Sequence, residues 1–274
     1  MAAGRFTDSL ALTGCFKRTE LEKGQTHDKI AVITGAGQGI GRGIAEIFAN
    51  EGADIVINDL KADSRTSETQ KVIEPKDVRC IVVPADVTKR QDVENLFDQT
   101  WKLLGPADIL VNNAGIETII PFTEITDEQW EAVTNTNLKS GWMCSQSFCK
   151  RLIIEERKGA IVNIGSIQAA RVLPGRTHYA PSKLAIEALT RNVSAEVGPH
   201  GIRVNCIHPG LIETPMIQWV LQSPDILPQV TAQISLGRTG LPCEIGTAAA
   251  FLASDEAAYI TGQSLYVDGG WVGK

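Results

Sequence analysis

The chain alternates short, continuous runs of β-branched and apolar residues with longer segments that have helical periodicity. Strands that are apolar on both faces are typical of parallel sheets covered by helices on either side. We therefore predict an α/β fold, with a single doubly wound domain around a seven-stranded parallel sheet. The predicted strands lie at residues 29–34, 53–59, 79–86, 107–115, 159–166, 201–210 and 262–270.

The boundaries of this domain follow from where the alternation begins and ends. Regular patterning starts near residue 28, so we predict a flexible N-terminal extension over residues 1–27 and one folded domain over residues 28–274. Helical periodicity runs from about residue 126 to 158 and from 178 to 198. Residues 211–241 contain several prolines and show no periodicity, and long loops in compact domains are usually functional. We expect this segment to be a lid.

Charge and composition restrict the partners. The chain has 26 Lys and Arg against 32 Asp and Glu, without a basic cluster, which argues against nucleic acid and anionic membranes. No apolar run approaches the roughly 18 residues that a membrane span needs. The 6 cysteines are scattered without a CxxC pair or a histidine cluster, so we expect no metal site and a cytoplasmic location. A small molecule is the expected partner.

A glycine-rich turn follows the first predicted strand and opens the first predicted helix. In this context TGAGQGIG, residues 34–41, predicts a dinucleotide site. Glycines let the backbone approach a pyrophosphate, and the helix N-terminus offers free N–H groups. The alternative is a plain tight turn. The residues expected to contact the cofactor here are Gly35, Gln38, Gly39, Ile40 and Gly41.

An acidic residue, Asp59, ends the second predicted strand, about 20 residues beyond the glycines. A carboxylate at this place can accept hydrogen bonds from a ribose 2′-hydroxyl and would repel a 2′-phosphate. We therefore expect NAD rather than NADP, with Leu60 lining the same site. Lys61 stands close by and would soften this discrimination. The alternative is a solvated acid at a strand end.

Tyr179 and Lys183 are four residues apart in a predicted helix, so they share one helical face. A phenol has a reference pKa of about 10, and a neighbouring ammonium group is expected to lower that pKa. The pair could then exchange a proton with an alcohol or carbonyl oxygen. Ser166, at the end of the fifth predicted strand, would hold that oxygen beside the phenol. Alone, a tyrosine and a lysine at this spacing are more often structural.

Together these residues resemble the short-chain dehydrogenase/reductase family, over about residues 28–270. The resemblance implies a Rossmann fold and a catalytic set of Asn137, Ser166, Tyr179 and Lys183. In that scheme Lys183 also binds the nicotinamide ribose, and Asn137 holds a water that relays the proton. The motifs that carry the resemblance are TGAGQGIG, ADVT at 85–88, NNAG at 112–115, NTNL at 135–138, Ser166, the Tyr179 and Lys183 pair, HPG at 208–210 and DGG at 268–270.

The resemblance also implies the rest of the cofactor site and an assembly. Family members commonly form tetramers, so we predict a homotetramer built through the helical regions near residues 126–157 and 178–198. Adenine is expected between Asp86 and Val87. The residues expected to line the remaining cofactor are Asn113, Ala114, Gly115, Pro209, Gly210, Ile212 and Thr214.

The residues expected at the substrate are polar. Glu117 and Gln168 stand where the family usually faces its substrate, and NNAGIE resembles the sugar 1-dehydrogenase branch. A carboxylate and an amide suit a polyhydroxylated ligand because both bind hydroxyl groups. Arg171, Arg176 and His178 add cationic groups near the same entrance, which makes an anionic sugar or hydroxy acid a variant. The alternatives are a solvated Glu117 and surface arginines.

Three functions remain open. We expect an NAD-dependent dehydrogenase that acts on a CH–OH group of a sugar or related polyol. The first alternative is a 3-oxoacyl (carrier protein) reductase or hydroxy-acid dehydrogenase of the same family, although the usual NADPH preference of oxoacyl reductases conflicts with Asp59. The second alternative is a catalytically silent nucleotide-binding scaffold, which would have no need of the intact Asn137, Ser166, Tyr179 and Lys183 set.

Overall fold

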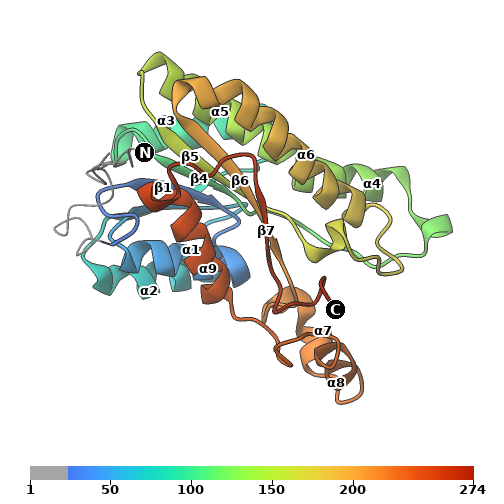
Figure 1. The fold of residues 1–274 in the computed structure, drawn as a ribbon. Helices are drawn as coiled ribbons and strands as arrows, with labels where there is room; N and C mark the ends of the chain where they lie inside the picture. The colour runs from blue at the N-terminus through green and yellow to red at the C-terminus, as the bar shows by residue number, and fades with distance from the viewer. Residues whose placement is uncertain (1–23) are drawn as a thin grey trace, which may run out of the picture.

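A computed structural model of the chain describes residues 24–274, in which seven strands form one parallel sheet (Figure 1). The strand order is β3-β2-β1-β4-β5-β6-β7, and every neighbouring pair is parallel. The predicted α/β class and the seven-stranded doubly wound sheet are confirmed. The strands are β1 (Ile30–Thr34), β2 (Asp54–Asp59), β3 (Cys80–Pro84), β4 (Ile109–Asn112), β5 (Gly159–Ile164), β6 (Ile202–Pro209) and β7 (Ser264–Val267).

Helices cover both faces of the sheet (Figure 1). On one face, α1 (Gly39–Asn50), α2 (Ser64–Ile73) and α9 (Pro242–Ala253) bury Ile44, Phe48 and Ile245 against the strands. On the other face, α3 (Arg90–Leu103), α5 (Ser140–Ile154) and α6 (Tyr179–Val197) bury Phe97 and Phe148. Burial on both faces explains why the strands are apolar throughout rather than alternating.

The strand order reverses between β1 and β4, because the chain returns past β1 after β3. In open α/β sheets, ligands bind in the crevice outside the carboxyl ends of the strands at this reversal. The predicted turn after β1 and the segments after β2, β4, β5 and β6 all emerge at that edge. The fold therefore gathers distant segments into one place.

Two helical predictions need correction. The helical region predicted over about residues 126–158 ends at Ile154 and consists of α4 (Asp127–Thr134), a π-helical segment (Asn135–Lys139) and α5. Residues 211–241, predicted as irregular, contain the short helices α7 (Gln218–Leu221) and α8 (Ile226–Thr231). Prolines hide such short helices from a periodicity test, because each helix has too few residues to show a repeat. An isolated bridge between Ile212 and Gly240 joins the two ends of this segment.

Most of the predicted N-terminal extension, residues 1–23, lies outside the described residues. The last four residues of that extension pack on α1. Thr26 is fully buried and donates from Oγ1 to the carbonyl of Phe48 at 3.1 Å, and the N–H of Gln25 donates to Glu51 at 2.7 Å. These contacts satisfy polar groups near the C-terminal end of α1, so the packed part of the chain begins before residue 28.

Within residues 24–274, no helix is both long enough and apolar enough to cross a membrane.

Candidate active site

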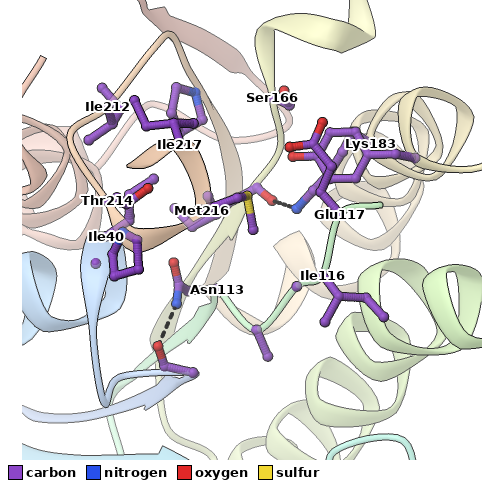
Figure 2. A pocket seen from close by; sticks show the side chains of 18 of the residues that line it. Ile40, Asn113, Ile116, Glu117, Ser166, Lys183, Ile212, Thr214, Met216 and Ile217 are labelled. Carbon is purple, nitrogen blue, oxygen red and sulfur yellow. Dashed lines mark hydrogen bonds between the residues drawn. The ribbon is translucent and has the colours of Figure 1, made fainter. Parts of the chain in front are cut away.

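A cavity of about 630 Å³ lies between the turn after β1, the carboxyl ends of the strands and the segment 211–241. In Figure 2, Ser166, Lys183 and Glu117 lie on one side of it, and Ile40 and Thr214 on the other. Predicted residues that line the cavity are Gly35, Gln38, Gly39, Ile40, Asp59, Leu60, Asp86, Val87, Asn113, Ala114, Gly115, Glu117, Ser166, Gln168, Arg176, Tyr179, Lys183, Pro209, Gly210, Ile212 and Thr214. The predicted residues that do not line it are Gly41, Asn137, Arg171 and His178.

The glycine-rich turn has a shape that only glycines allow. Gly35 and Gly39 have φ angles of +64° and +56°, in the left-handed region that favours glycine. A Cβ atom on Gly41 would lie 2.3 Å from the carbonyl oxygen of Gly35. Gln38 precedes α1 without a side-chain cap, so the first N–H groups of the helix remain free for a ligand. This cradle fits the pyrophosphate of a dinucleotide.

Hydrogen bonds of Thr34 and Asn113 fix the glycine-rich turn to the segment after β4. The hydroxyl of Thr34 accepts hydrogen bonds from the N–H groups of Asn113 and Ala114, both at 3.0 Å. The amide of Asn113 donates in turn to the carbonyls of Thr34 at 2.9 Å and Gly35 at 3.0 Å. Asn113 therefore fixes the turn rather than offering its amide to a ligand. Sequence reasoning gave Thr34 no role, because a threonine at the end of a strand is common.

Near the end of β2 the cavity is lined by one acidic and one basic residue, Asp59 and Arg65. Asp59 accepts from the N–H groups of Gly37 at 3.1 Å and Leu60 at 2.8 Å, which fixes its carboxylate at the end of β2. Arg65 also lines the cavity, with its Nη2 3.6 Å from Asp59 Oδ1. Lys61, expected to soften the cofactor preference, does not line the cavity. Sequence reasoning missed Arg65, which reaches Asp59 from the first turn of α2.

Asn137 lies behind the cavity, in the π-helical segment between α4 and α5. Its Oδ1 accepts from the N–H of Ile116 at 2.8 Å, and its Nδ2 donates to the carbonyl of the same residue at 3.0 Å. The amide also reaches the hydroxyl of Ser182 in α6 at 3.2 Å. π-helical turns inside α-helices are frequent at functional sites. Here the wider turn lets one amide join the segment after β4 to α6.

Tyr179 and Lys183 lie in the first turns of α6. The helix begins at Tyr179, so Pro181 falls in the first turn, where its missing N–H is tolerated. Lys183 Nζ donates to the carbonyl of Ile164 at 2.9 Å and lies 5.7 Å from the centroid of the Tyr179 ring. Ser166, after β5, lines the same cavity. The fold thus brings the three predicted catalytic side chains together.

The expected acidification of the phenol needs correction. Burial, and next the carboxylate of Glu117, raise the pKa of Tyr179 above its usual value, whereas Ser166 and Arg176 lower it less. Lys183 does not offset this, because its amine bonds to a backbone carbonyl and burial lowers its own pKa to about 8. At neutral pH the phenol therefore keeps its proton, ready to donate it.

A buried histidine supports Ser166 from behind. The N–H of Ser166 donates to Nδ1 of His208 at 3.1 Å, and Nε2 of His208 lies 3.4 Å from a carboxylate oxygen of Glu187. Burial lowers the pKa of His208, so the ring is neutral at neutral pH. A Cβ atom on Gly165 would lie 2.4 Å from the His208 ring. This explains why position 165 is a glycine, whereas the family that the sequence resembles often has a serine there.

An ion pair occupies the predicted substrate side. Oε1 of Glu117 accepts from Nε of Arg176 at 2.5 Å and from Nε2 of Gln168 at 3.0 Å. The side chains of Glu117 and Arg176 are each only 12% exposed. The three residues come from the segments after β4, after β5 and before α6. The sequence predicted these residues at the substrate, but not that they would bind one another.

Arg171 and His178, also predicted at the substrate, are placed elsewhere. Nε2 of His178, a fully buried residue, lies 2.6 Å from the hydroxyl of Thr118. The guanidinium of Arg171 stacks on Trp271, 5.2 Å from the ring centroid, and hydrogen-bonds the side chain of Gln233. Both Trp271 and Gln233 line the cavity, and sequence reasoning did not place either of them there. Arg171 therefore ties the C-terminal segment to the segment 211–241 and does not line the cavity.

Most of the remaining lining is apolar and comes from the segment 211–241 and its neighbours. No group of three or more His, Cys, Asp or Glu residues within residues 24–274 is arranged to hold a metal ion. The apolar lining residues on this side are Ile167, Leu173, Leu211, Met216, Ile217, Trp219, Val220, Ile226, Val230 and Trp271.

This chain is similar in sequence to known reductases. A family model described as enoyl-(acyl carrier protein) reductase matches residues 35–272. The 3-oxoacyl-(acyl-carrier-protein) reductase FabG of Chlamydia muridarum is 39% identical over 244 residues, which are 89% of this chain and 97% of that protein.

Two solved structures are similar in fold and sequence. A candidate gluconate dehydrogenase from Agrobacterium tumefaciens has a TM-score of 0.86 and 34% identity, covering 91% of this chain and 98% of that one. A gluconate 5-dehydrogenase from Burkholderia cenocepacia, in complex with NADP and tartrate, has a TM-score of 0.85 and 31% identity, covering 90% and 96%.

Proposed function

This chain belongs to the short-chain dehydrogenase/reductase family, and from that premise we propose that it interconverts a carbonyl and a hydroxyl group with a nicotinamide dinucleotide. One observation carries the proposal. Ser166, Tyr179 and Lys183 line the same cavity as the glycine cradle at the N-terminus of α1. A scaffold that only bound a nucleotide would have no need of this set.

The proposed chemistry assigns each side chain a task. A bound nicotinamide ring would supply or accept the hydride. The hydroxyl of Ser166 would hold the substrate oxygen beside the phenol of Tyr179, which donates its proton to that oxygen during reduction. Because the pKa of Tyr179 is raised, the phenol carries at neutral pH the proton that reduction requires. Lys183 would bind the cofactor ribose. Asn137 would fix the wall of the cavity behind the phenol.

We infer a 3-oxoacyl thioester as the first candidate substrate, ahead of the sugar that the sequence favoured. The similarity to a 3-oxoacyl-(acyl-carrier-protein) reductase supports it. The apolar lining contributed by the lid also supports it, because an acyl chain would bury its methylene groups there. The inference places the acyl chain against the lid and the oxo group against Tyr179.

A sugar, sugar acid or polyol is the second candidate. Glu117, Gln168 and Arg176 form a polar wall beside Tyr179, and such groups bind hydroxyls. Similarity to solved gluconate dehydrogenases supports this candidate as well. Under this proposal the enzyme would oxidise a CH–OH group, with Tyr179 as the proton acceptor.

For the cofactor we propose NAD, with weaker use of NADP. The fixed carboxylate of Asp59 suits a ribose 2′-hydroxyl and opposes a 2′-phosphate. Arg65, 3.6 Å from that carboxylate, would attract a phosphate and so limits the discrimination. The preference is therefore for NAD without strict exclusion of NADP.

We also propose a homotetramer and a cytoplasmic location. Exposed apolar side chains gather on the helices predicted to mediate assembly, including Trp130 of α4, Trp142 of α5 and Leu184 of α6. Burying such side chains between subunits would remove apolar surface from water. Light scattering tests the assembly, and a single monomeric species would contradict it.

The test of the activity compares the wild type with Tyr179→Phe. We expect reduced cofactor to be consumed with acetoacetyl-CoA, a 3-oxoacyl thioester, and Tyr179→Phe to slow this by about 10²–10⁴-fold. Cofactor affinity, measured by fluorescence titration, should stay the same. Oxidation of polyols or sugar acids without thioester reduction would favour the second candidate. Cofactor binding without any turnover would contradict the enzyme proposal.

A further inference from the structure

The ion pair between Glu117 and Arg176 has a consequence for the charge of the substrate. The two residues are 59 positions apart in sequence, yet Nε of Arg176 lies 2.5 Å from Oε1 of Glu117, and both side chains are mostly buried. The same guanidinium donates from Nη1 to the carbonyl of Pro174 at 3.1 Å. Arg176 is therefore held in place and already has a negative partner.

Other charges near the pair do not change this balance. Lys183 is the nearest further cation of the catalytic set, but it is only 4% exposed and bonds to the carbonyl of Ile164. Asp59, Arg65 and Asp86 line the far end of the cavity, beyond the glycine turn. Beside Tyr179 the cavity therefore presents one carboxylate and one guanidinium that neutralise each other, together with the ammonium group of Lys183, which is bonded to the carbonyl of Ile164.

The pair still offers hydrogen bonds. Among residues 24–274, Oε2 of Glu117 and Nη2 of Arg176 have no hydrogen-bond partner, and both residues line the cavity. The pair thus leaves one acceptor atom on Glu117 and one donor atom on Arg176, which together suit a group that both donates and accepts, such as a hydroxyl or an amide. A carboxylate matches them poorly, because Glu117 would repel it and hold the guanidinium that it needs.

We propose that Glu117 is a specificity-determining residue: by occupying Arg176 it makes this subsite select an uncharged hydroxyl or amide group and reject carboxylates. This deepens the proposed function and rests on it, because it assumes that the cavity beside Tyr179 holds the substrate. The proposed role of Glu117 distinguishes the candidate substrates by their charge. Neutral polyols and the amide-containing arm of an acyl thioester fit the subsite, whereas sugar acids do not.

The test measures binding rather than turnover. Gluconate and its neutral analogue glucitol are titrated by calorimetry into the NAD-saturated protein. We expect Glu117→Gln to strengthen gluconate binding by about tenfold or more, since it frees one guanidinium for a carboxylate while keeping the amide hydrogen bonds. Glucitol affinity should change by less than about threefold, because a neutral ligand gains no charge partner.

Two further variants locate the effect. In Glu117→Gln combined with Arg176→Gln, the gain for gluconate should disappear, because the freed cation is gone. Glu124→Gln removes an exposed acid from the same loop and should leave both ligands unaffected. If Glu117→Gln does not fold, Glu117→Asp should give a smaller gain, because the shorter side chain also releases Arg176.

Three outcomes would overturn the proposal. They are wild-type protein that binds gluconate as tightly as Glu117→Gln does, a Glu117→Gln protein without detectable gluconate binding, and a gain that survives the loss of Arg176. None of them depends on catalysis, so they are distinct from failure of the Tyr179→Phe test. Even if the protein had no activity, the binding measurements would still decide whether the subsite rejects carboxylates.

Discussion

The cavity has two ends that are built in different ways: the proposed cofactor end around the glycine-rich turn, and the proposed substrate end around Glu117 and Arg176. At the cofactor end, the shape comes from the backbone: Gly35 and Gly39 adopt positive φ angles, Gly41 packs against a carbonyl, and Thr34 and Asn113 tie the turn to β4. These contacts join segments that leave neighbouring strands.

At the substrate end, the shape comes from side chains that meet across the chain. Arg176 pairs with Glu117, and Arg171 stacks on Trp271, which is 100 residues away. No backbone conformation dictates these pairs. We therefore expect one substitution in the backbone of the cofactor end to cause a large loss of cofactor affinity. A substitution at the substrate end should change substrate binding only slightly.

The sharpest contrast comes from glycine substitutions at the cofactor end. Gly41→Ala would place a Cβ atom 2.3 Å from a backbone carbonyl that cannot move without opening the turn. We expect cofactor affinity, measured by quenching of protein fluorescence, to fall by about 100-fold or more, with a loss of stability of order 1–3 kcal/mol. Gly198→Ala is the control, because a Cβ atom there meets nothing within 4 Å. Equal cofactor affinity in both variants would contradict a backbone-built site.

Lys183 stands where the two ends meet, and its burial predicts a pH effect on folding in the cofactor-free protein. Burial lowers its pKa from 10.5 to about 8. Below about pH 8 the amine is charged in both states, and the folded state bears the full desolvation cost. Between the two pKa values the unfolded state binds more protons, so the free energy of unfolding rises with pH, by about 3 kcal/mol at most.

The measurement compares urea unfolding of the wild type and Lys183→Met from pH 7 to 10. The variant lacks the titrating amine, so its free energy of unfolding should rise less over this range than that of the wild type. Cys80, Cys144, Cys149 and Tyr179 titrate in both proteins and cancel in the difference, whereas Cys206 is coupled to Lys183 and belongs to the effect that is measured. Parallel pH profiles for the two proteins would show that Lys183 is solvated and would remove it from the buried site.

The difference between the two ends also explains which features could be predicted from the sequence. The seven strands, the glycine turn and the start of α6 near Pro181 were predicted, because each depends on local composition and backbone rules. The π-helical turn at Asn137 was missed, since nothing in a helical pattern signals an extra residue in one turn. Arg171 was predicted at the substrate but stacks on Trp271, because stacking partners depend on tertiary folding.

A substitution of Asp59 also tests the difference between the two ends. We expect it to change cofactor affinity less than Gly41→Ala does, because Asp59 contributes a side chain to the end that is built from backbone. Asp59→Ala removes the charge that opposes a 2′-phosphate and leaves Arg65 without its weak partner 3.6 Å away. We expect the ratio of NADP to NAD affinity to rise by about tenfold or more, through tighter NADP and weaker NAD binding. Arg65→Ala should move the ratio the other way. An unchanged ratio in both variants would place the ribose elsewhere.

The smallest expected effect belongs to Arg171 at the side-chain-built end. Its guanidinium stacks on Trp271 and bonds to Gln233, but it is not itself part of the cavity wall. A partly exposed cation–π contact contributes about 0.5–1 kcal/mol, so Arg171→Ala should raise KM for the substrate by about two- to fivefold. Turnover at saturation should hold, because Ser166, Tyr179 and Lys183 do not touch this residue.

Arg171→Lys sharpens the same prediction, since lysine keeps the charge but loses the planar stacking face and the fork of hydrogen bonds. It should resemble Arg171→Ala if stacking and hydrogen bonding hold Trp271, and the wild type if charge alone matters. A large drop in turnover at saturation in either variant would mean that the lid and Trp271 position the catalytic groups. In that case the substrate end would fail as sharply as the glycine turn, and the contrast between the two ends would not hold.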